Sequence, residues 1–201
     1  MAKADWVNVN PSSGSGNKTV NVSSNAEHTG RTARSTVLTI TAPNVDAKTV
    51  TVNQSGKPEF VENTSDTATS VNTGQNVTIS GKSNSKKLTF SLGAGDLSIN
   101  LPSAYTAASL STENGVEISG DPGATAVYDW SIVINVPANS SLEEMSRQII
   151  VTDEGGHTDV CVLTQAAGAP TLSVSKDTIE LDYLGTAVSF DITSNTSWTI
   201  S

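Results

Sequence analysis

The sequence is poor in the residues that most often carry out chemistry. It contains one cysteine, two histidines, and three each of tryptophan, tyrosine and phenylalanine among 201 residues. The single cysteine, Cys161, excludes a disulfide framework within the chain, and the apolar run VCVLTQ around it predicts a small buried side chain. His28 and His157 lie in polar loop sequence without triad partners or zinc-ligand spacing, so both are predicted to be plain surface residues.

Charge is also sparse, at 15% of the chain, and it is mostly of one sign. The formal net charge is −9 and the pI is about 4.5, whereas nucleic acids and anionic membranes are bound by basic surfaces. No stretch approaches the ~20 apolar residues of a membrane span, and the start, MAKADWVNV, lacks an apolar signal core. We therefore expect no nucleic-acid partner, no membrane and no signal peptide, for a protein made and kept in the cytoplasm or released by lysis.

Catalytic and metal sites find little support in the pattern. The acidic stretches at Asp121 and at Asp153-Glu154 lack the spacing of a cation-binding loop, and each lies beside glycines that favour a turn. No particular pair of acids is linked as glycoside hydrolysis requires, and an aromatic groove for stacking sugars is missing. The sequence predicts no enzyme, no metal and no cofactor.

What the sequence does contain is a repeat. The run GQNVTISGKSNSKKLTF (74–90) matches the run GTAVSFDITSNTSWTI (185–200) with a constant shift in numbering, and the same shift relates Gln54 to Gln165, which each close a valine- and threonine-rich run (165 − 54 = 111). This shift is the repeat offset. Serine, threonine, asparagine, glycine and valine dominate, a composition typical of β-sheets with polar outer faces. A period of this size, roughly 110 residues, is that of one β-sandwich domain.

The repeat predicts an all-β fold of tandem sandwiches, one whole and two half. Residues 58–168 hold both halves of the pattern, residues 1–57 hold only the late half, and residues 169–201 hold only the early half. Strands are predicted at residues 6–10, 19–24, 35–41, 48–54, 116–119, 130–136, 148–152 and 159–165. Residues 66–75 and 93–100 are predicted to be long connections, and residues 140–145 (SSLEEM) a short helical turn.

The pattern resembles a known family at this point. Trp6 followed by alternation and the turn PSSGSG, a polar loop, and a strand ending in Gln54-Ser-Gly are similar to the BACON domain, as is the run 194–198 (SNTSW) closing on Trp198. The middle unit departs from that family pattern, because Lys87 stands where Trp198 falls at the repeat offset. The resemblance covers nearly the whole chain and implies an immunoglobulin-like β-sandwich.

The resemblance also implies functions. BACON domains occur in Bacteroidetes and their phages, often attached to glycosidases, and have been proposed to bind carbohydrate or mucin. A leaderless, acidic, all-β repeat of this kind looks more like a virion protein of a crAss-like phage, such as a capsid decoration or head-fibre protein. The expected partners are other copies of the chain or the major capsid protein, and the alternative is a module that binds mucin or host-surface glycans.

The two incomplete ends suggest how copies join. An unfilled sheet edge is an aggregation hazard that proteins cover or pair, and each end lacks what the other end supplies. The hypothesis is strand donation between subunits, which buries a set of apolar side chains worth roughly 1.5–3 kcal/mol each on full burial. The alternative for the C-terminal end is that the natural chain continues past residue 201 and completes its own last domain. The candidate packing residues are Trp6, Leu181, Val188, Phe190, Ile192 and Trp198.

Overall fold

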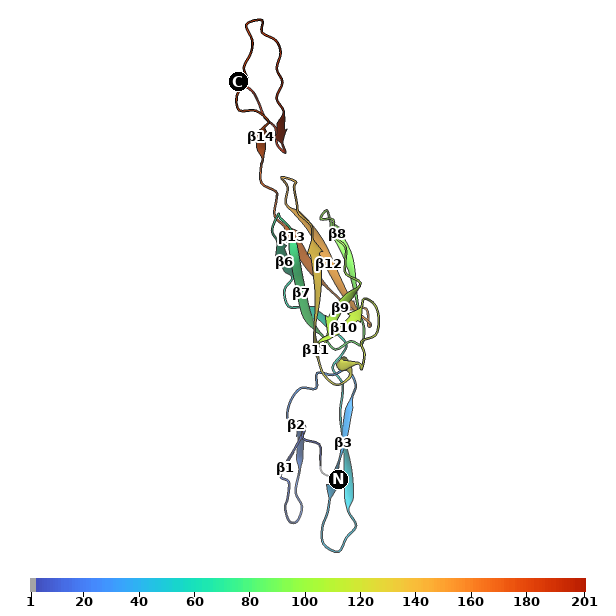
Figure 1. Cartoon of the computed structure of the whole chain (residues 1–201). Coiled ribbons are helices and arrows are strands. Elements are labelled where there is room, and N and C mark those ends of the chain that lie inside the picture. The colour runs from blue at the N-terminus through green and yellow to red at the C-terminus, as the bar shows by residue number, and fades with distance from the viewer. Residues whose placement is uncertain (1–2) are drawn as a thin grey trace.

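The strands form one closed body with an open unit at each end. The computed structural model describes residues 3–201, and Figure 1 shows the N-terminal unit and the C-terminal unit at opposite ends of an elongated molecule. No helix in the described residues is long and apolar enough to cross a membrane. The predicted all-β class of tandem sandwiches is confirmed, while the limits of independently folding units stay a prediction.

The N-terminal unit consists of two separate hairpins. Strands β1 (Val7–Asn10) and β2 (Asn21–Ser24) pair antiparallel, and so do β3 (Arg34–Ile40) and β4 (Lys48–Gln54). Val7 is fully buried, but most of the unit is exposed. Within residues 3–201, no further strand pairs with an outer edge of either hairpin.

The middle body is a two-layer sandwich. A five-stranded sheet has the order β10-β9-β11-β7-β5 and a four-stranded sheet has the order β6-β13-β12-β8. Strand β6 joins β13 in parallel, whereas the other pairs are antiparallel. The strands are β5 (Val61–Asn63), β6 (Thr67–Ser70), β7 (Gln75–Ser83), β8 (Leu88–Gly95), β9 (Ala104–Ala107), β10 (Leu110–Glu113), β11 (Tyr128–Val136), β12 (Met145–Asp153) and β13 (Thr158–Gln165).

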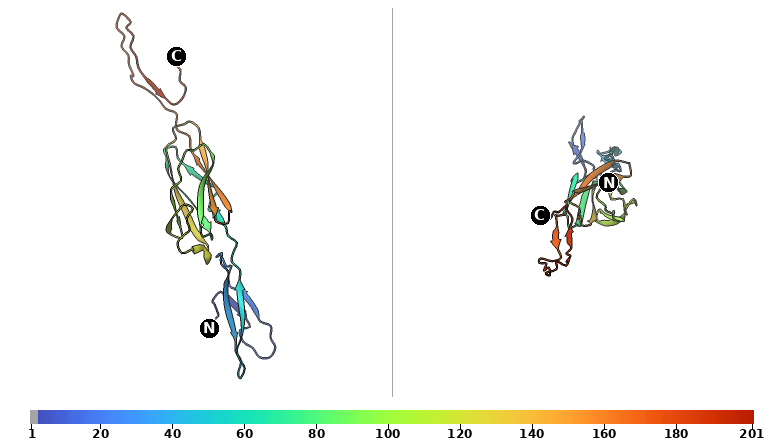
Figure 2. Two further views of the ribbon diagram at one scale, coloured as in Figure 1. Left: turned by 90° about the vertical axis from the view of Figure 1, so that its right-hand side faces the viewer. Right: turned by 90° about the horizontal axis from the view of Figure 1, so that it is seen from above.

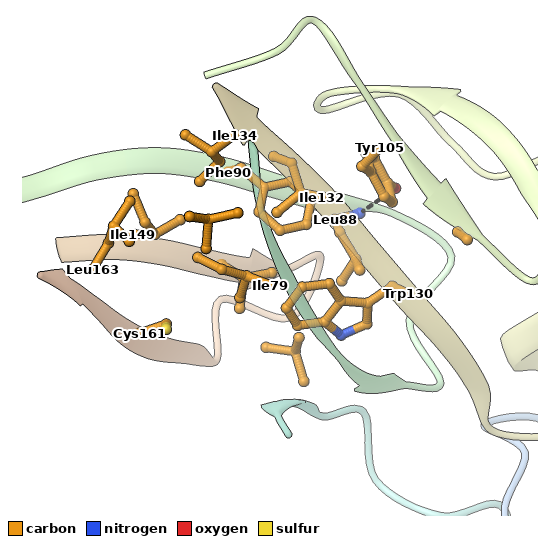
Figure 3. Packing of buried hydrophobic residues seen from close by; sticks show 14 of the residues in the cluster. Ile79, Leu88, Phe90, Tyr105, Trp130, Ile132, Ile134, Ile149, Cys161 and Leu163 are labelled. Atoms are coloured by element: carbon orange, nitrogen blue, oxygen red, sulfur yellow. Dashed lines mark hydrogen bonds between the residues drawn. The ribbon is translucent and has the colours of Figure 1, made fainter. Parts of the chain in front are cut away.

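The core lies between these two sheets because their strands alternate apolar and polar residues. Every second residue of β11 is buried, and Trp130 belongs to an aromatic group centred on Phe90 (Figure 3). The Phe90 ring lies 5.3 Å from Trp130 and 4.9 Å from Tyr105, both between centroids. Gly81 permits this packing, since a Cβ there would lie 1.9 Å from the Glu62 carbonyl oxygen and 2.4 Å from the Trp130 ring.

The C-terminal unit is an open hairpin. Strands β14 (Leu172–Val174) and β15 (Ile192–Ser194) pair antiparallel, and almost every residue from 169 to 201 is exposed. A long excursion connects the two strands, and Figure 2 shows it pointing away from the middle body.

Three predictions of local structure are wrong. Residues 66–75 contain β6, and the connection predicted at residues 93–100 begins inside β8, which ends at Gly95. Residues 116–119 make only an isolated bridge between Lys87 and Glu117. The strand beside β11 is β9, which forms a hairpin with β10. Short strands that form by pairing with a neighbouring strand have only a weak pattern of strand residues in their own sequence.

The predicted helical turn at residues 140–145 is also wrong. The segment bends and runs into β12, and the helical piece that the structure has is a single 3-10 turn, Pro122–Ala124. Asn139 is the cause, because its side chain accepts a hydrogen bond from Ser141 N and donates to the carbonyls of Glu143 and Ala166. Such local side-chain bonds compete with a helix for the same backbone groups.

Candidate functional site

The C-terminal unit reproduces the first ladder in the early half of the middle sandwich, pair by pair. Strand β14 pairs with β15 as Leu172↔Ser194, and β5 pairs with β7 as Val61↔Ser83, so both partners are shifted by the repeat offset. The other two pairs of each ladder follow the same offset. The repeat read from the sequence is therefore a repeat of strand register.

Side-chain hydrogen bonds repeat at the same offset. Asn84 Oδ1 accepts from Phe60 N at 3.0 Å, and Asn195 Oδ1 accepts from Thr171 N at 2.8 Å. The two amide groups then donate to equivalent carbonyls, that of Pro58 at 3.2 Å and that of Ala169 at 3.0 Å. The same asparagine tie thus anchors the start of both units.

The β3–β4 hairpin of the N-terminal unit reproduces the closing hairpin of the late half in the same way. Its β3–β4 ladder begins at Arg34↔Gln54, and the β12–β13 ladder begins at Met145↔Gln165, again separated by the repeat offset. Gln54 Nε2 donates to the Ala26 carbonyl, as Gln165 Nε2 donates to the equivalent Pro137 carbonyl. The two end units are the two halves of one fold.

The difference between the ends and the middle is burial. Val50 is 51% exposed and Ile40 is 52% exposed, whereas their equivalents Cys161 and Val151 are each 1% exposed. These positions face the core in the middle sandwich, where the opposite sheet covers them. In the N-terminal unit the same face has no opposite sheet among the described residues.

The C-terminal unit is open on the matching face. Val188 is 43% exposed and Phe190 is 37% exposed, while their equivalents Val77 and Ile79 are buried. Leu181 and Trp198 are exposed, and Ile192 is half-buried in β15. Five of the six candidate packing residues therefore lie in the C-terminal unit. Their role in packing between subunits stays a prediction.

Trp6, the sixth predicted packing residue, lies elsewhere. Its ring is half-buried beneath the Arg34 guanidinium, whose carbon lies 4.5 Å from the ring centroid. The structure therefore does not bring Trp6 together with the C-terminal residues. The candidate packing residues leave out the apolar face of the N-terminal hairpins, which the sequence itself marks as part of a sandwich core: Leu38, Ile40, Val50 and Val52.

The N-terminal unit is held firmly against one end of the middle sandwich. Arg31 donates through Nη1 to the Asn84 carbonyl at 2.6 Å and pairs through Nη2 with Asp121. Backbone bonds from Arg31 N to Gly123 O and from Thr32 N to Ala124 O, both 2.9 Å, complete the joint. Asp121, which was considered above as a cation ligand, pairs with the Arg31 guanidinium in this joint.

The end units carry opposite charge. Residues 1–57 contain six basic and three acidic side chains, a net +3, and residues 169–201 contain one basic and four acidic ones, a net −3. In the C-terminal unit, hydrogen bonds from Thr186 lower the pKa of Asp182, which keeps that carboxylate ionised and the turn before Gly185 formed. The two halves are thus complementary in charge as well as in register.

Catalytic groups are not assembled in the described part of the chain. Residues 3–201 hold no group of three or more potential metal ligands. Asp153 contacts His157 Nδ1 at 2.9 Å, but that aspartate is buried and no described nucleophile adjoins the exposed imidazole. The surface prediction for His28 is wrong, because its ring is buried and bonds the Thr32 carbonyl at 2.7 Å, as Asn139 bonds the equivalent Glu143 carbonyl.

The last candidate reactive group is the thiol of Cys161. Cys161 is confirmed as a buried side chain, and burial raises the pKa of its thiol. A small hollow of about 110 Å³ lies above it, lined by hydroxyl and apolar side chains without an acid or an aromatic ring: Thr64, Ser65, Thr67, Ala68, Thr78, Ile79 and Ser80. This hollow offers no groups for hydrolysis or for stacking a sugar.

These features define an all-β protein with one closed two-layer sandwich and an open unit of related strands at each end. Residues 1–55 match the family model BACON, described as a putative binding domain, N-terminal, and the match covers the N-terminal unit. No curated protein matches the chain.

Among solved structures, the zebrafish RET cadherin-like domains 1 to 4 align with 69% of this chain at 11% identity and a TM-score of 0.34. This chain spans about a third of the length of that one, 34%. At that TM-score the likeness supports no argument, and the fold assignment follows from the sheets described above.

Proposed function

We propose that the protein is a non-enzymatic structural protein that assembles through its two open end units. The observation that carries the proposal is that both end units keep the strand register of a closed sandwich while their core faces are exposed. Exposed apolar sheet faces of this kind mark interaction surfaces. Because the exposed face has its apolar residues at the positions that are buried in a closed sandwich, we expect the matching sheet of a sandwich to cover it.

The setting we propose is a bacteriophage particle, in which the chain decorates or bridges the capsid. The family resemblance of the sequence suggests this setting, whereas the BACON match over residues 1–55 supports a binding module more generally. Quantifying the chain in purified phage particles tests it. A copy number that matches a capsid lattice supports the proposal, and absence from the particles refutes it.

Glycan binding is the alternative that the family resemblance of the sequence raises. Its one support is that resemblance, since Trp130 is in the core and the hollow beside Cys161 has no aromatic residue in its lining. A glycan array probed with monomeric protein separates the two functions. Saturable binding to one glycan class would favour the alternative.

The assembly itself is tested by measuring mass against concentration. Sedimentation or light scattering of the full chain is expected to show species larger than a monomer as concentration rises. Val188→Asp with Phe190→Asp should abolish them, because two charges would be placed on the face to be buried. Val133→Asp is the matched control, since Val133 is similarly exposed on the outer face of the middle sandwich. A wild-type chain that remains monomeric throughout refutes the proposal.

Hydrolysis is expected to be absent. No nucleophile, base and orienting group are joined in the described residues, and the acid closest to a histidine is buried. Pure protein incubated with polysaccharides should therefore release no reducing ends. Turnover that a single Asp or Glu substitution removes would contradict this expectation.

A further inference from the structure

We propose that the open face of the N-terminal unit is covered by residues 171–201 of a second copy, in the register that the middle sandwich uses between its own halves. This inference rests on the proposed assembly function and names its partner. The middle sandwich supplies the template, because its early and late halves correspond to the two end units at the repeat offset. Each contact between those halves therefore predicts a contact between two copies.

The first predicted contact is a parallel ladder. In the middle sandwich β6 lies along the outer edge of β13, with Val162 N donating to Asp66 O at 2.8 Å and Ala166 N donating to Ser70 O at 3.0 Å. Subtracting the offset from the donors and adding it to the acceptors places Thr51 N on the partner's Asp177 and Ser55 N on the partner's Leu181. The edge of β4 that takes this strand is unpaired in the described chain, and an unpaired edge is a template for strand addition.

The second contact is a glutamine lock. Gln165 is buried and donates through Nε2 to Val71 O at 3.3 Å as well as to Pro137 O. Gln54 makes the equivalent of the bond to Pro137, because it donates to the Ala26 carbonyl. The equivalent of Val71 at the repeat offset is residue 182. The carbonyl of the partner's Asp182 would therefore complete the pattern. That carbonyl belongs to a turn already formed in the free unit, because Gly185 N donates to Asp182 O at 3.0 Å, as Gly74 N does to Val71 O at 3.1 Å.

The third contact is the core. The apolar face of β3 and β4 would pack on the partner's Ile179, Leu181, Val188 and Phe190, which correspond to Ala68, Ser70, Val77 and Ile79. Three of these four are larger than their equivalents. The offset does not extend to β2, because it places Asn21 and Ser23 at the positions of the buried residues Ile132 and Ile134. The predicted core contact is therefore confined to the apolar face of β3 and β4.

Charge favours unlike ends over like ends. The N-terminal unit at +3 meets the C-terminal unit at −3, whereas two N-terminal units or two C-terminal units would repel each other. Charge complementarity therefore opposes a symmetric dimer through either face.

The shape of the molecule makes the contact intermolecular. Figure 1 and the left-hand view of Figure 2 show the end units at opposite ends of the middle body, and the joint at Arg31 fixes the N-terminal unit against its own end. One chain in this shape cannot lay its C-terminal unit on its own N-terminal unit. A head-to-tail contact of this kind is heterologous and generates rings or filaments.

Cysteine pairing tests the register. The template pair Thr164↔Thr69 of β13 and β6 maps to Asn53 and the partner's Glu180, on the outward side of the ladder. Chains carrying Asn53→Cys are mixed with chains carrying Glu180→Cys and oxidised, and a disulfide between the two is expected. Thr193→Cys in place of Glu180→Cys is the control, expected to yield about tenfold less because a disulfide needs Cβ atoms within about 4.5 Å. The native Cys161 is buried and is present equally in both mixtures.

The outcomes separate this inference from the proposed function. Association with disulfides between Asn53→Cys chains alone, or with equal yields for both C-terminal positions, refutes the register and leaves assembly standing. A single chain carrying both substitutions that closes on itself as a monomer refutes the contact between copies. Monomers in every mixture refute both the inference and the proposed function.

Discussion

Replacing Asn84 by alanine is expected to destabilise the middle sandwich far more than replacing its counterpart Asn195. The two side chains make the same pair of ties at equivalent positions of the repeat, but Asn84 is fully buried and Asn195 is exposed. Asn84 Oδ1 accepts from Phe60 N at 3.0 Å, and Nδ2 lies 3.2 to 3.4 Å from the carbonyls of Pro58, Lys57 and Thr29. One amide thus fixes the first strand and the joint to the N-terminal unit.

The magnitude follows from the groups left behind. Asn84→Ala leaves the Phe60 N–H and the Lys57 carbonyl, both on half-buried residues, without this partner, at about 1–3 kcal/mol for each group that stays unsatisfied, while the carbonyl of the exposed Pro58 can bond water. With the first two groups unsatisfied, the loss is about 3 kcal/mol of unfolding free energy. Asn195→Ala exchanges equivalent bonds for water at the surface and should cost less than about 1 kcal/mol, since a typical net hydrogen bond is worth no more.

Thermal and denaturant unfolding followed by circular dichroism measures both variants, at concentrations where the chain is monomeric. A loss of about 3 kcal/mol corresponds to a fall of about 10–20 °C in Tm for a domain near 100 residues. Equal shifts in the two variants, or an Asn84→Ala shift within about 0.5 kcal/mol of zero, would refute the reasoning from burial.

Three further predictions concern the middle sandwich. Ile132→Ala should cost about 2–5 kcal/mol, because Ile132 is buried and leaves a cavity, while Val133→Ala, on the exposed side of the same strand, should stay within about 0.5 kcal/mol; denaturant midpoints compare them. The Cys161 thiol, whose pKa burial raises, should react with a thiol reagent near neutral pH much more slowly than it does in denaturant, and equal rates would contradict its burial. Residues 58–168 should fold alone, because they contain both halves of the pattern; a disordered circular dichroism spectrum and rapid proteolysis would show otherwise.

The sequence by itself determined the fold class and the repeat. Alternation of apolar and polar residues in runs such as WSIVINV requires strands with one buried face, and the markers at Gln54 and Gln165 located the period. The register of the end units followed the same offset because the pairing of a strand is set by which residues must share a face. The exposed C-terminal residues Val188 and Phe190 were found from that logic alone.

Only the tertiary structure decided what surrounds each residue. His28 and Asn139 occupy equivalent loops and bond equivalent carbonyls, which no local pattern in a polar stretch reveals. Trp6 and Trp130 both sit in alternating sequence, yet one lies under Arg34 and the other fills the core. Periodicity specifies which face of a strand is apolar, but burial depends on whether a second sheet is present to cover that face, and that is a property of the assembled chain.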